Sequence, residues 1–228
     1  MTRRRSRAQP VAALRVVLAG GSAAFRQGLQ VLLEAGGVDV VASVQEPSAL
    51  GDAVHSLAPD LAIVDAWISP SALDSGVEAA LSLKGARPDV GVIVVANHPD
   101  PQDMQRLVDG SESGLGYLLS DTVQDVLGLL DALRRVAGGG LALSPEVVQP
   151  LILERGQAAP LSRLSARDHE VLSLVAQGHS NSGIASALLL SAKTADSHVT
   201  GLLQELGVEH DGTENGRARA TLSLLRSS

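Results

Sequence analysis

The order of apolar and polar residues divides most of the chain into alternating strands and helices. Short apolar runs that predict buried strands cover residues 14–18, 38–44, 61–64, 90–96 and 116–119. Apolar residues at helical spacing fill the intervals, at residues 22–33, 47–57, 75–84 and 101–108, and again up to residue 136. This alternation is typical of a five-stranded parallel sheet with helices on both faces.

Polar residues and glycines predict where the last of these helices begins and ends. Asp121 or Thr122 is expected to cap it, and three glycines from residue 138 should stop it. Residues 13–137 would then form one α/β domain. Residues 138–160 are expected to be a linker with a short helix that starts near Pro145 and is broken near Pro150.

A different pattern, of short helices alone, covers residues 161–228. Ser165, Asn181 and Ser191 are expected to cap three helices, with a fourth over about residues 217–226. The second and third are spaced like a helix-turn-helix. The third has an apolar face, made of Ala195, Val199, Leu202, Leu203 and Leu206. Its other face carries short polar side chains that suit contact with base edges in a major groove, namely Lys193, Asp196, Ser197, Thr200 and Gln204.

Composition and charge narrow the chemistry. The 228 residues are 45% hydrophobic, enough for a substantial core, and they include no cysteine, which excludes disulfides and thiolate sites. The net charge of −7 counts against strong non-specific DNA affinity, because DNA binders usually present a basic face. No nucleophile elbow or metal-ligand spacing occurs, so we expect neither an enzyme nor a cofactor.

The first twelve residues are basic, with arginines at positions 3, 4, 5 and 7. The apolar stretch after them is short and is interrupted by Arg15, so residues 1–12 are interpreted as a disordered tail and not as an export signal. No apolar run approaches the roughly 20 residues that span a bilayer. We expect a cytoplasmic protein with no membrane contact.

Motifs spread over the chain carry a family resemblance. Residues 164–194 read L-S-x-R-x-x-E-V-L-x-L-V-A-x-G-x-S-N-x-x-I-A-x-x-L-x-L-S-x-x-T, and further motifs are LRVVLA at 14–19, PDLAIVDAWISP at 59–70, PDVGVIVVANH at 88–98 and GYLL at 116–119. In these the chain resembles the NarL/FixJ class of bacterial two-component response regulators. The resemblance implies a CheY-like (βα)5 receiver, a linker helix and a four-helix LuxR-type domain that binds double-stranded DNA as a homodimer.

The resemblance places Asp65 at the phosphoacceptor position of the receiver. The partners that this chemistry needs are replaced, since Gly20 and Gly21 stand at the acidic pair, Ala96 at the Thr/Ser position and Ser120 at the Lys position. Tyr117 keeps the aromatic switch position. One carboxylate holds a divalent ion poorly. We therefore predict an atypical receiver without an aspartyl-phosphate cycle; the alternative is that Asp65 has no task.

The uncharged strand ends leave two interpretations of the receiver pocket. It could take a small molecule or a protein partner, with Trp67 as a contact, or Trp67 could be a loop aromatic that covers the sheet end. A nucleotide site is not expected, because the turn at Gly20 and Gly21 lacks the G-x-G-x-x-G and Walker patterns.

The DNA module also departs from its family. Asp196 stands where the family usually has a lysine, and Gly201 and Glu205 stand at later positions that are usually basic. The remaining candidate contacts are Asn181, Lys193, Thr194, Ser197, His198 and Thr200. Two functions follow: a DNA-binding transcription regulator controlled by ligand, partner or dimerisation, or a protein-interaction module that titrates another regulator without reading DNA.

Overall fold

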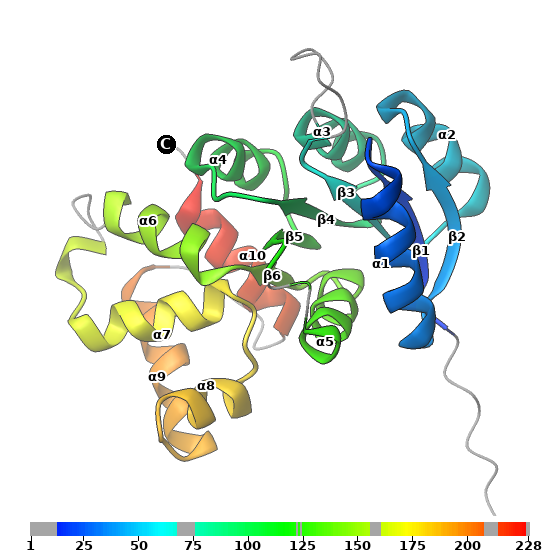
Figure 1. The fold of residues 1–228 in the computed structure, drawn as a ribbon. Coiled ribbons are helices and arrows are strands. Elements are labelled where there is room, and N and C mark those ends of the chain that lie inside the picture. The colour runs from blue at the N-terminus through cyan, green and yellow to red at the C-terminus, as the bar shows by residue number, and fades with distance from the viewer. Residues whose placement is uncertain are drawn as a thin grey trace, which may run out of the picture.

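The N-terminal half is a parallel sheet with helices on both faces (Figure 1). The computed structural model describes residues 13–67, 76–121, 123, 125–155, 161–207 and 214–226. In these ranges the sheet has six strands in the order β2-β1-β3-β4-β5-β6. Their bounds are β1 Arg15–Ala19, β2 Asp39–Val44, β3 Leu61–Asp65, β4 Gly91–Ala96, β5 Leu115–Leu119 and β6 Leu141–Leu143.

Five helices cover the two faces of the sheet, and successive residues of a strand contact helices on opposite faces. The helices are α1 Ala23–Ala35, α2 Pro47–Leu57, α3 Gly76–Ala86, α4 Pro101–Asp109 and α5 Val126–Ala137. On β1, Val16 and Leu18 pack with α1 and α5, whereas Val17 and Ala19 pack with α2, α3 and α4. The prediction of a parallel α/β domain with helices on both faces is confirmed.

Two predictions about the end of this domain were wrong. The sheet has a sixth strand, β6, which pairs with β5 in a range that we expected to be linker. Three apolar residues after a glycine run give too weak a pattern to predict a strand. Asp125, whose carboxylate accepts from Leu127 N at 3.2 Å, caps α5 in place of Asp121 or Thr122, and Thr122 lies outside the described residues.

The C-terminal part consists of helices: α6 Pro145–Arg155, a 3₁₀ turn η2 Leu161–Arg163, α7 Ala166–Ala176, α8 Asn181–Ala187, α9 Ala192–Glu205 and α10 Glu214–Leu225. Contrary to our prediction, α6 continues through Pro150. Proline removes one backbone donor from a helix interior. Burial of Val147, Val148, Leu151 and Ile152 offsets that loss, because these side chains hold both halves of α6 in the core.

Serine side chains cap the three helices after the linker. Ser165 forms a capping box with Asp168, and Ser191 accepts from Thr194 N, as the sequence predicted. The cap of α8 is Ser180 and not Asn181, since Ser180 Oγ accepts from Gly183 N at 3.2 Å. Asn181 is therefore the first residue inside α8, and its amide is available for contacts with other helices.

The two halves of the chain pack on each other through α10, α4 and α6. Gln105 Nε2 donates to Leu225 O at 3.1 Å, and Arg226 Nη2 donates to Ser111 O at 2.6 Å. One apolar cluster continues from the face covered by α2, α3 and α4, through α6, into α7–α10. The sheet and the C-terminal helices thus share a core.

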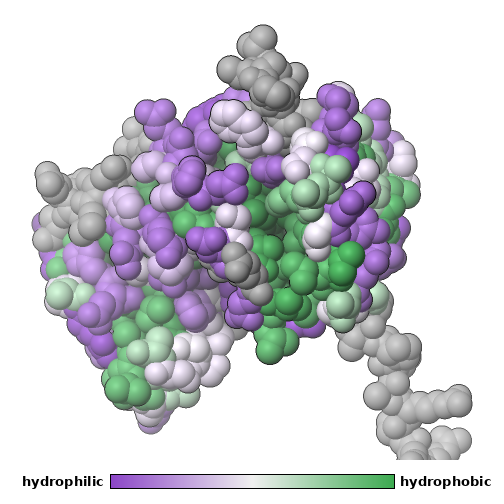
Figure 2. Space-filling model, in the orientation of Figure 1, coloured by the Kyte–Doolittle hydropathy of each residue, from purple (hydrophilic) through white to green (hydrophobic). Residues whose placement is uncertain are grey.

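No helix in the described ranges is both long enough and apolar enough to cross a membrane. Apolar side chains do reach the surface on the opposite side of the sheet from α4. Val31 on α1 is 65% exposed and Leu127 on α5 is 79% exposed. Figure 2 shows apolar surface over these two helices.

Candidate DNA-binding surface and receiver pocket

The residues predicted for the receiver pocket follow neighbouring strands at one edge of the sheet. Gly20 follows β1, Asp65 ends β3, Ala96 ends β4 and Ser120 follows β5. Ser120 N donates to Ala96 O at 2.9 Å, which ties two of these strand ends together. Trp67 is 72% exposed, so most of its ring faces solvent and does not cover the sheet end.

Asp65 has no acidic partner from β1, and the space for one is filled. A Cβ atom at Gly20 would lie 2.8 Å from Phe25 Cδ1 and 3.1 Å from Asp65 Cβ. The guanidinium of Arg26 donates to the carbonyl of Gly20 and adds a positive charge at this strand end, which does not favour a metal cation there. The sequence pattern showed Phe25 only as an apolar helix residue and gave no signal for the contact of Arg26.

The electrostatics of Asp65 follow from its half-buried position. Burial raises the pKa of its carboxyl, and a hydrogen bond from Trp67 N at 3.0 Å opposes that rise only in part. Among the described residues, no group of three or more His, Cys, Asp or Glu side chains is arranged to hold a metal ion.

Tyr117, at the predicted switch position, lies inside the protein. It is 1% exposed, in the same core cluster as Met104 of α4. A hydrogen bond with the backbone of Asp100, the N-cap of α4, joins β5 to that helix. Burial of the ring raises the pKa of Tyr117 to about 12. Tyr117 is thus joined to α4, which is the helix on which α10 packs.

The outward face of α9 carries the candidate DNA contacts. Lys193, Thr194, Ser197 and His198 are exposed and Thr200 is half-buried. The apolar face of α9 packs against α7 and α8, as predicted, with Ala195, Val199, Leu202, Leu203 and Leu206 all buried. In Figure 1, α8 and α9 lie at the end of the molecule away from the receiver sheet. The polar face of α9 is therefore open to a large partner.

Asn181 does not lie free beside the α9 contacts. Its Nδ2 donates to Asp196 Oδ1 on α9, and its Oδ1 accepts from Arg217 Nη1 on α10. Arg217 is only 9% exposed. The amino-acid pattern gives no signal for Arg217, since nothing in the local pattern of α10 connects it with a residue 36 positions earlier.

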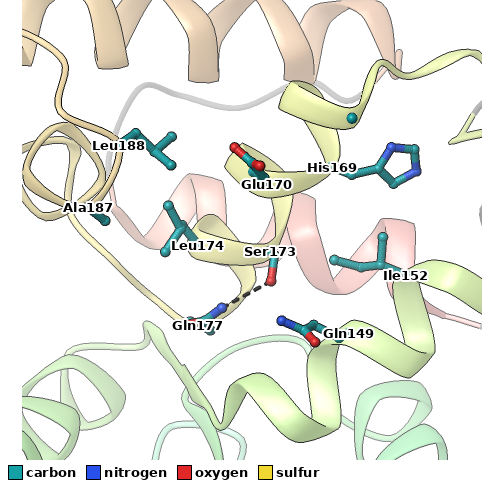
Figure 3. A pocket seen from close by; sticks show the side chains of 10 residues that line it. Gln149, Ile152, His169, Glu170, Ser173, Leu174, Gln177, Ala187 and Leu188 are labelled. Carbon is teal, nitrogen blue, oxygen red and sulfur yellow. Dashed lines mark hydrogen bonds between the residues drawn. The ribbon is translucent and has the colours of Figure 1, made fainter.

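A groove of about 400 Å³ lies between α6, α7 and the end of α8 (Figure 3). Its lining includes Gln149, Ile152, His169, Ser173, Leu174 and Leu188. Several polar groups here are already engaged: Gln177 Nε2 donates to Ser173 Oγ at 3.0 Å, and His169 Nδ1 lies 3.0 Å from Ser165 O. The sequence gave no signal for this groove, because its residues come from three separate helices.

Comparison with known proteins adds to this geometry. The family of bacterial regulatory proteins of the luxR type, GerE, matches residues 162–213, which include α7, α8 and α9. A nitrate/nitrite response regulator protein homolog of Haemophilus influenzae is 30% identical over 196 residues, which are 86% of this chain and 91% of the relative.

Solved structures match over both halves of the chain. The response regulator RcsB in complex with DNA is 27% identical, with a TM-score of 0.50, and the match covers 93% of this chain and 98% of RcsB. A structure of two RcsB dimers bound to two parallel DNAs is 24% identical, with a TM-score of 0.51 and the same coverage.

Proposed function

The chain belongs to the NarL/LuxR family of response regulators, DNA-binding transcription factors and not enzymes, and on this premise we propose that it works without an aspartyl-phosphate cycle. The observation that carries the proposal is the contact between Gly20 and Phe25 beside Asp65. A phosphorylation site needs a divalent cation to neutralise the incoming phosphoryl group. The ring of Phe25 occupies the space that a side chain at residue 20 would enter, and the guanidinium of Arg26 adds a positive charge at the carbonyl of Gly20.

Phosphotransfer can be tested directly on the full chain. Incubation with acetyl phosphate and Mg²⁺ is expected to leave the intact mass unchanged. A stoichiometric gain of one phosphoryl group that disappears in Asp65→Asn would overturn the proposal.

For DNA binding, we infer that α9 supplies the contacts, through Lys193, Thr194, Ser197, His198 and Thr200. Four of these side chains are exposed, and short polar groups of this kind bond base edges or phosphates. The single cation among them, Lys193, implies a weak dependence on salt, since each phosphate contact adds about one unit to the slope of log affinity against log salt.

This assignment can be tested by fluorescence anisotropy with a duplex from the chain's own upstream region. Lys193→Ala is expected to weaken binding and to reduce the salt slope by about one. Arg87→Ala removes the same charge from the receiver, where Arg87 pairs with Asp89, and serves as the control. Equal effects of both variants would refute the assignment.

Control of the regulator is proposed to act through dimerisation or a partner. In this family the last helix commonly forms the dimer contact. In this chain the last helix, α10, packs on α4 of the receiver. The polar face of α9 is open at the same time. A signal that separated α10 from α4 would therefore free a dimer surface and leave the reading helix unchanged. The signal could be a small molecule or a protein partner at the receiver, where the exposed apolar surface over α1 and α5 offers a contact.

The second candidate function is a protein-interaction module that titrates another regulator. It is favoured by the acidic residues Asp196 and Glu205 on the exposed face of α9 and by the net charge of −7. Acidic side chains repel the DNA backbone. Absence of DNA binding at low salt, together with stable association with a second helix-turn-helix protein, would support this alternative.

A further inference from the structure

Asp196, Asn181 and Arg217 form a chain of hydrogen bonds that joins α9, α8 and α10. We propose that Asp196 is a positioning residue, which fixes the orientation of α9 so that its polar face can meet DNA. The proposal rests on the inferred role of α9 in DNA binding. It reverses the simplest view of Asp196, in which its carboxylate does no more than repel phosphates.

The central residue of this chain of bonds has the right chemistry for two unlike partners. A side-chain amide offers both a donor and an acceptor. Asn181 gives its donor, Nδ2, to the carboxylate of Asp196 and its acceptor, Oδ1, to the guanidinium of Arg217. Hydrogen bonds to charged groups are roughly twice as strong as neutral ones. An acid at position 196 therefore completes a sequence of bonds that begins at the largely buried Arg217.

The hydrogen bonds add a directional restraint to the apolar contacts of α9. Two of the buried side chains between α8 and α9, Ala185 and Ala195, are small. Apolar burial has no preferred direction, whereas hydrogen bonds weaken steeply when their angles change. Asp196 lies between the buried Ala195 and the exposed Ser197, so its bond to α8 acts at the border between the apolar and the polar face of α9.

Two substitutions at Asp196 separate position from charge. Asp196→Asn removes the negative charge but keeps an oxygen that accepts from Asn181 Nδ2. Asp196→Lys replaces the negative charge with a positive one but offers no acceptor to Asn181 Nδ2. If charge alone mattered, DNA affinity would rise from Asp to Asn to Lys. If Asp196 positions α9, the Asn variant binds most tightly, and the Lys variant binds about fivefold more weakly than Asn, the factor for one lost hydrogen bond.

Glu205 provides a matched control on the same helix. It is exposed, and among the described residues its side chain makes no hydrogen bond. Glu205→Gln and Glu205→Lys are therefore expected to follow charge alone, with Lys binding DNA at least as tightly as Gln. The experiment measures anisotropy of the upstream duplex with full-length protein and all four variants, over a range of salt concentrations. An affinity of Asp196→Lys equal to or above that of Asp196→Asn would overturn the proposal.

A second measurement keeps the positioning role testable without DNA. The side-chain amide signal of Asn181 in the ¹⁵N–¹H NMR spectrum of the free protein is expected to stay near its position in Asp196→Asn and to shift in Asp196→Lys. A signal that is the same in both variants would overturn the positioning role. Failure of every protein to bind DNA, with the amide shift present, would instead refute the proposed DNA-binding role of α9 and, with it, the purpose assigned to the bonds.

Discussion

The backbone of Gly20 lies against the ring of Phe25, so closely that a Cβ atom at Gly20 would be 2.8 Å from Phe25 Cδ1. This distance is shorter than van der Waals contact, and any side chain at residue 20 requires the ring to move. The missing acid of the receiver and the ring on α1 are thus two parts of one packing arrangement. Replacing the glycine alone cannot restore the pocket of a phosphorylated receiver.

Gly20→Asp is predicted to destabilise the protein by about 1–3 kcal/mol, the usual cost of adding atoms to a well-packed site. Mg²⁺ should not recover this loss, because Arg26 remains at the carbonyl of Gly20. Urea unfolding with and without Mg²⁺ measures both effects. The double variant Gly20→Asp, Phe25→Ala provides room for the new carboxylate. Tight Mg²⁺ binding by Gly20→Asp alone would contradict the packing argument.

Asp65→Asn is predicted to stabilise the protein at neutral pH. Burial raises the folded-state pKa of Asp65, so the ionised carboxylate destabilises the fold above that pKa. Below the ordinary pKa of an unfolded aspartate the group is protonated in both states, and the difference between the variant and the natural protein should vanish. Thermal unfolding over a pH series tests this. The control is Asp52→Asn on the exposed side of α2, for which no such gain is expected.

Tyr117→Phe should cost about 1 kcal/mol of stability, because the hydrogen bond to the backbone of Asp100 is lost.

The pKa of Tyr117 is raised from 10.0 to about 12. A raised tyrosine pKa contributes stability that is full below pH 10 and declines as pH rises through about 12. Since Tyr117 is the single tyrosine, near-ultraviolet absorbance follows its ionisation alone. Ionisation at the ordinary pKa would show that the ring is accessible to solvent.

Arg226→Ala is predicted to loosen the contact between α10 and α4. The guanidinium donates to the carbonyls of Val108 and Ser111, at 3.4 Å and 2.6 Å, and the variant leaves both without this donor. The loss should be about 1–3 kcal/mol at this contact. Hydrogen exchange is expected to rise in α4 and α10 but not in β1 or β3. Arg87→Ala is the control, and unchanged exchange in α10 would show that the contact depends on apolar packing alone.

Thr221→Val is predicted to act in the opposite direction. Thr221 on α10 is 0% exposed, and its hydroxyl has no hydrogen-bond partner among the described residues. A buried hydroxyl without a partner costs about 1–3 kcal/mol, and valine has nearly the same shape. The variant should unfold at higher urea concentration with an unchanged slope. A loss of stability would mean that the hydroxyl has an ordered water as its partner.

Local pattern was sufficient for most of the fold. Ser165 and Ser191 cap the helices that the sequence assigned to them, and the apolar face of α9 is buried. Where two cap residues are adjacent, as with Ser180 and Asn181, residue type alone could not decide between them. β6 was missed for the same kind of reason, because its three residues are too few to show a period.

The candidate site was less predictable, because it depends on contacts between residues far apart in the sequence. Asp65 and the residues around it could be placed at the strand ends, since parallel strands end at one edge of the sheet. The contact of Phe25 with Gly20, and the bond between Arg217 and Asn181, depend on how whole helices pack. Residue types and local spacing contain no information on that packing.

The position of α10 against α4 also has a thermodynamic consequence. If dimers on DNA use α10, the receiver and a second copy of the chain compete for one helix. Because both protomers must release α10, the apparent dimer dissociation constant is then the intrinsic constant divided by the square of the fraction of molecules in which α10 is released. A rise in the cellular concentration of the protein and a weakening of the Arg226 contact would have the same effect on promoter occupancy. The abundance of the regulator would itself act as a signal, even in the absence of any ligand.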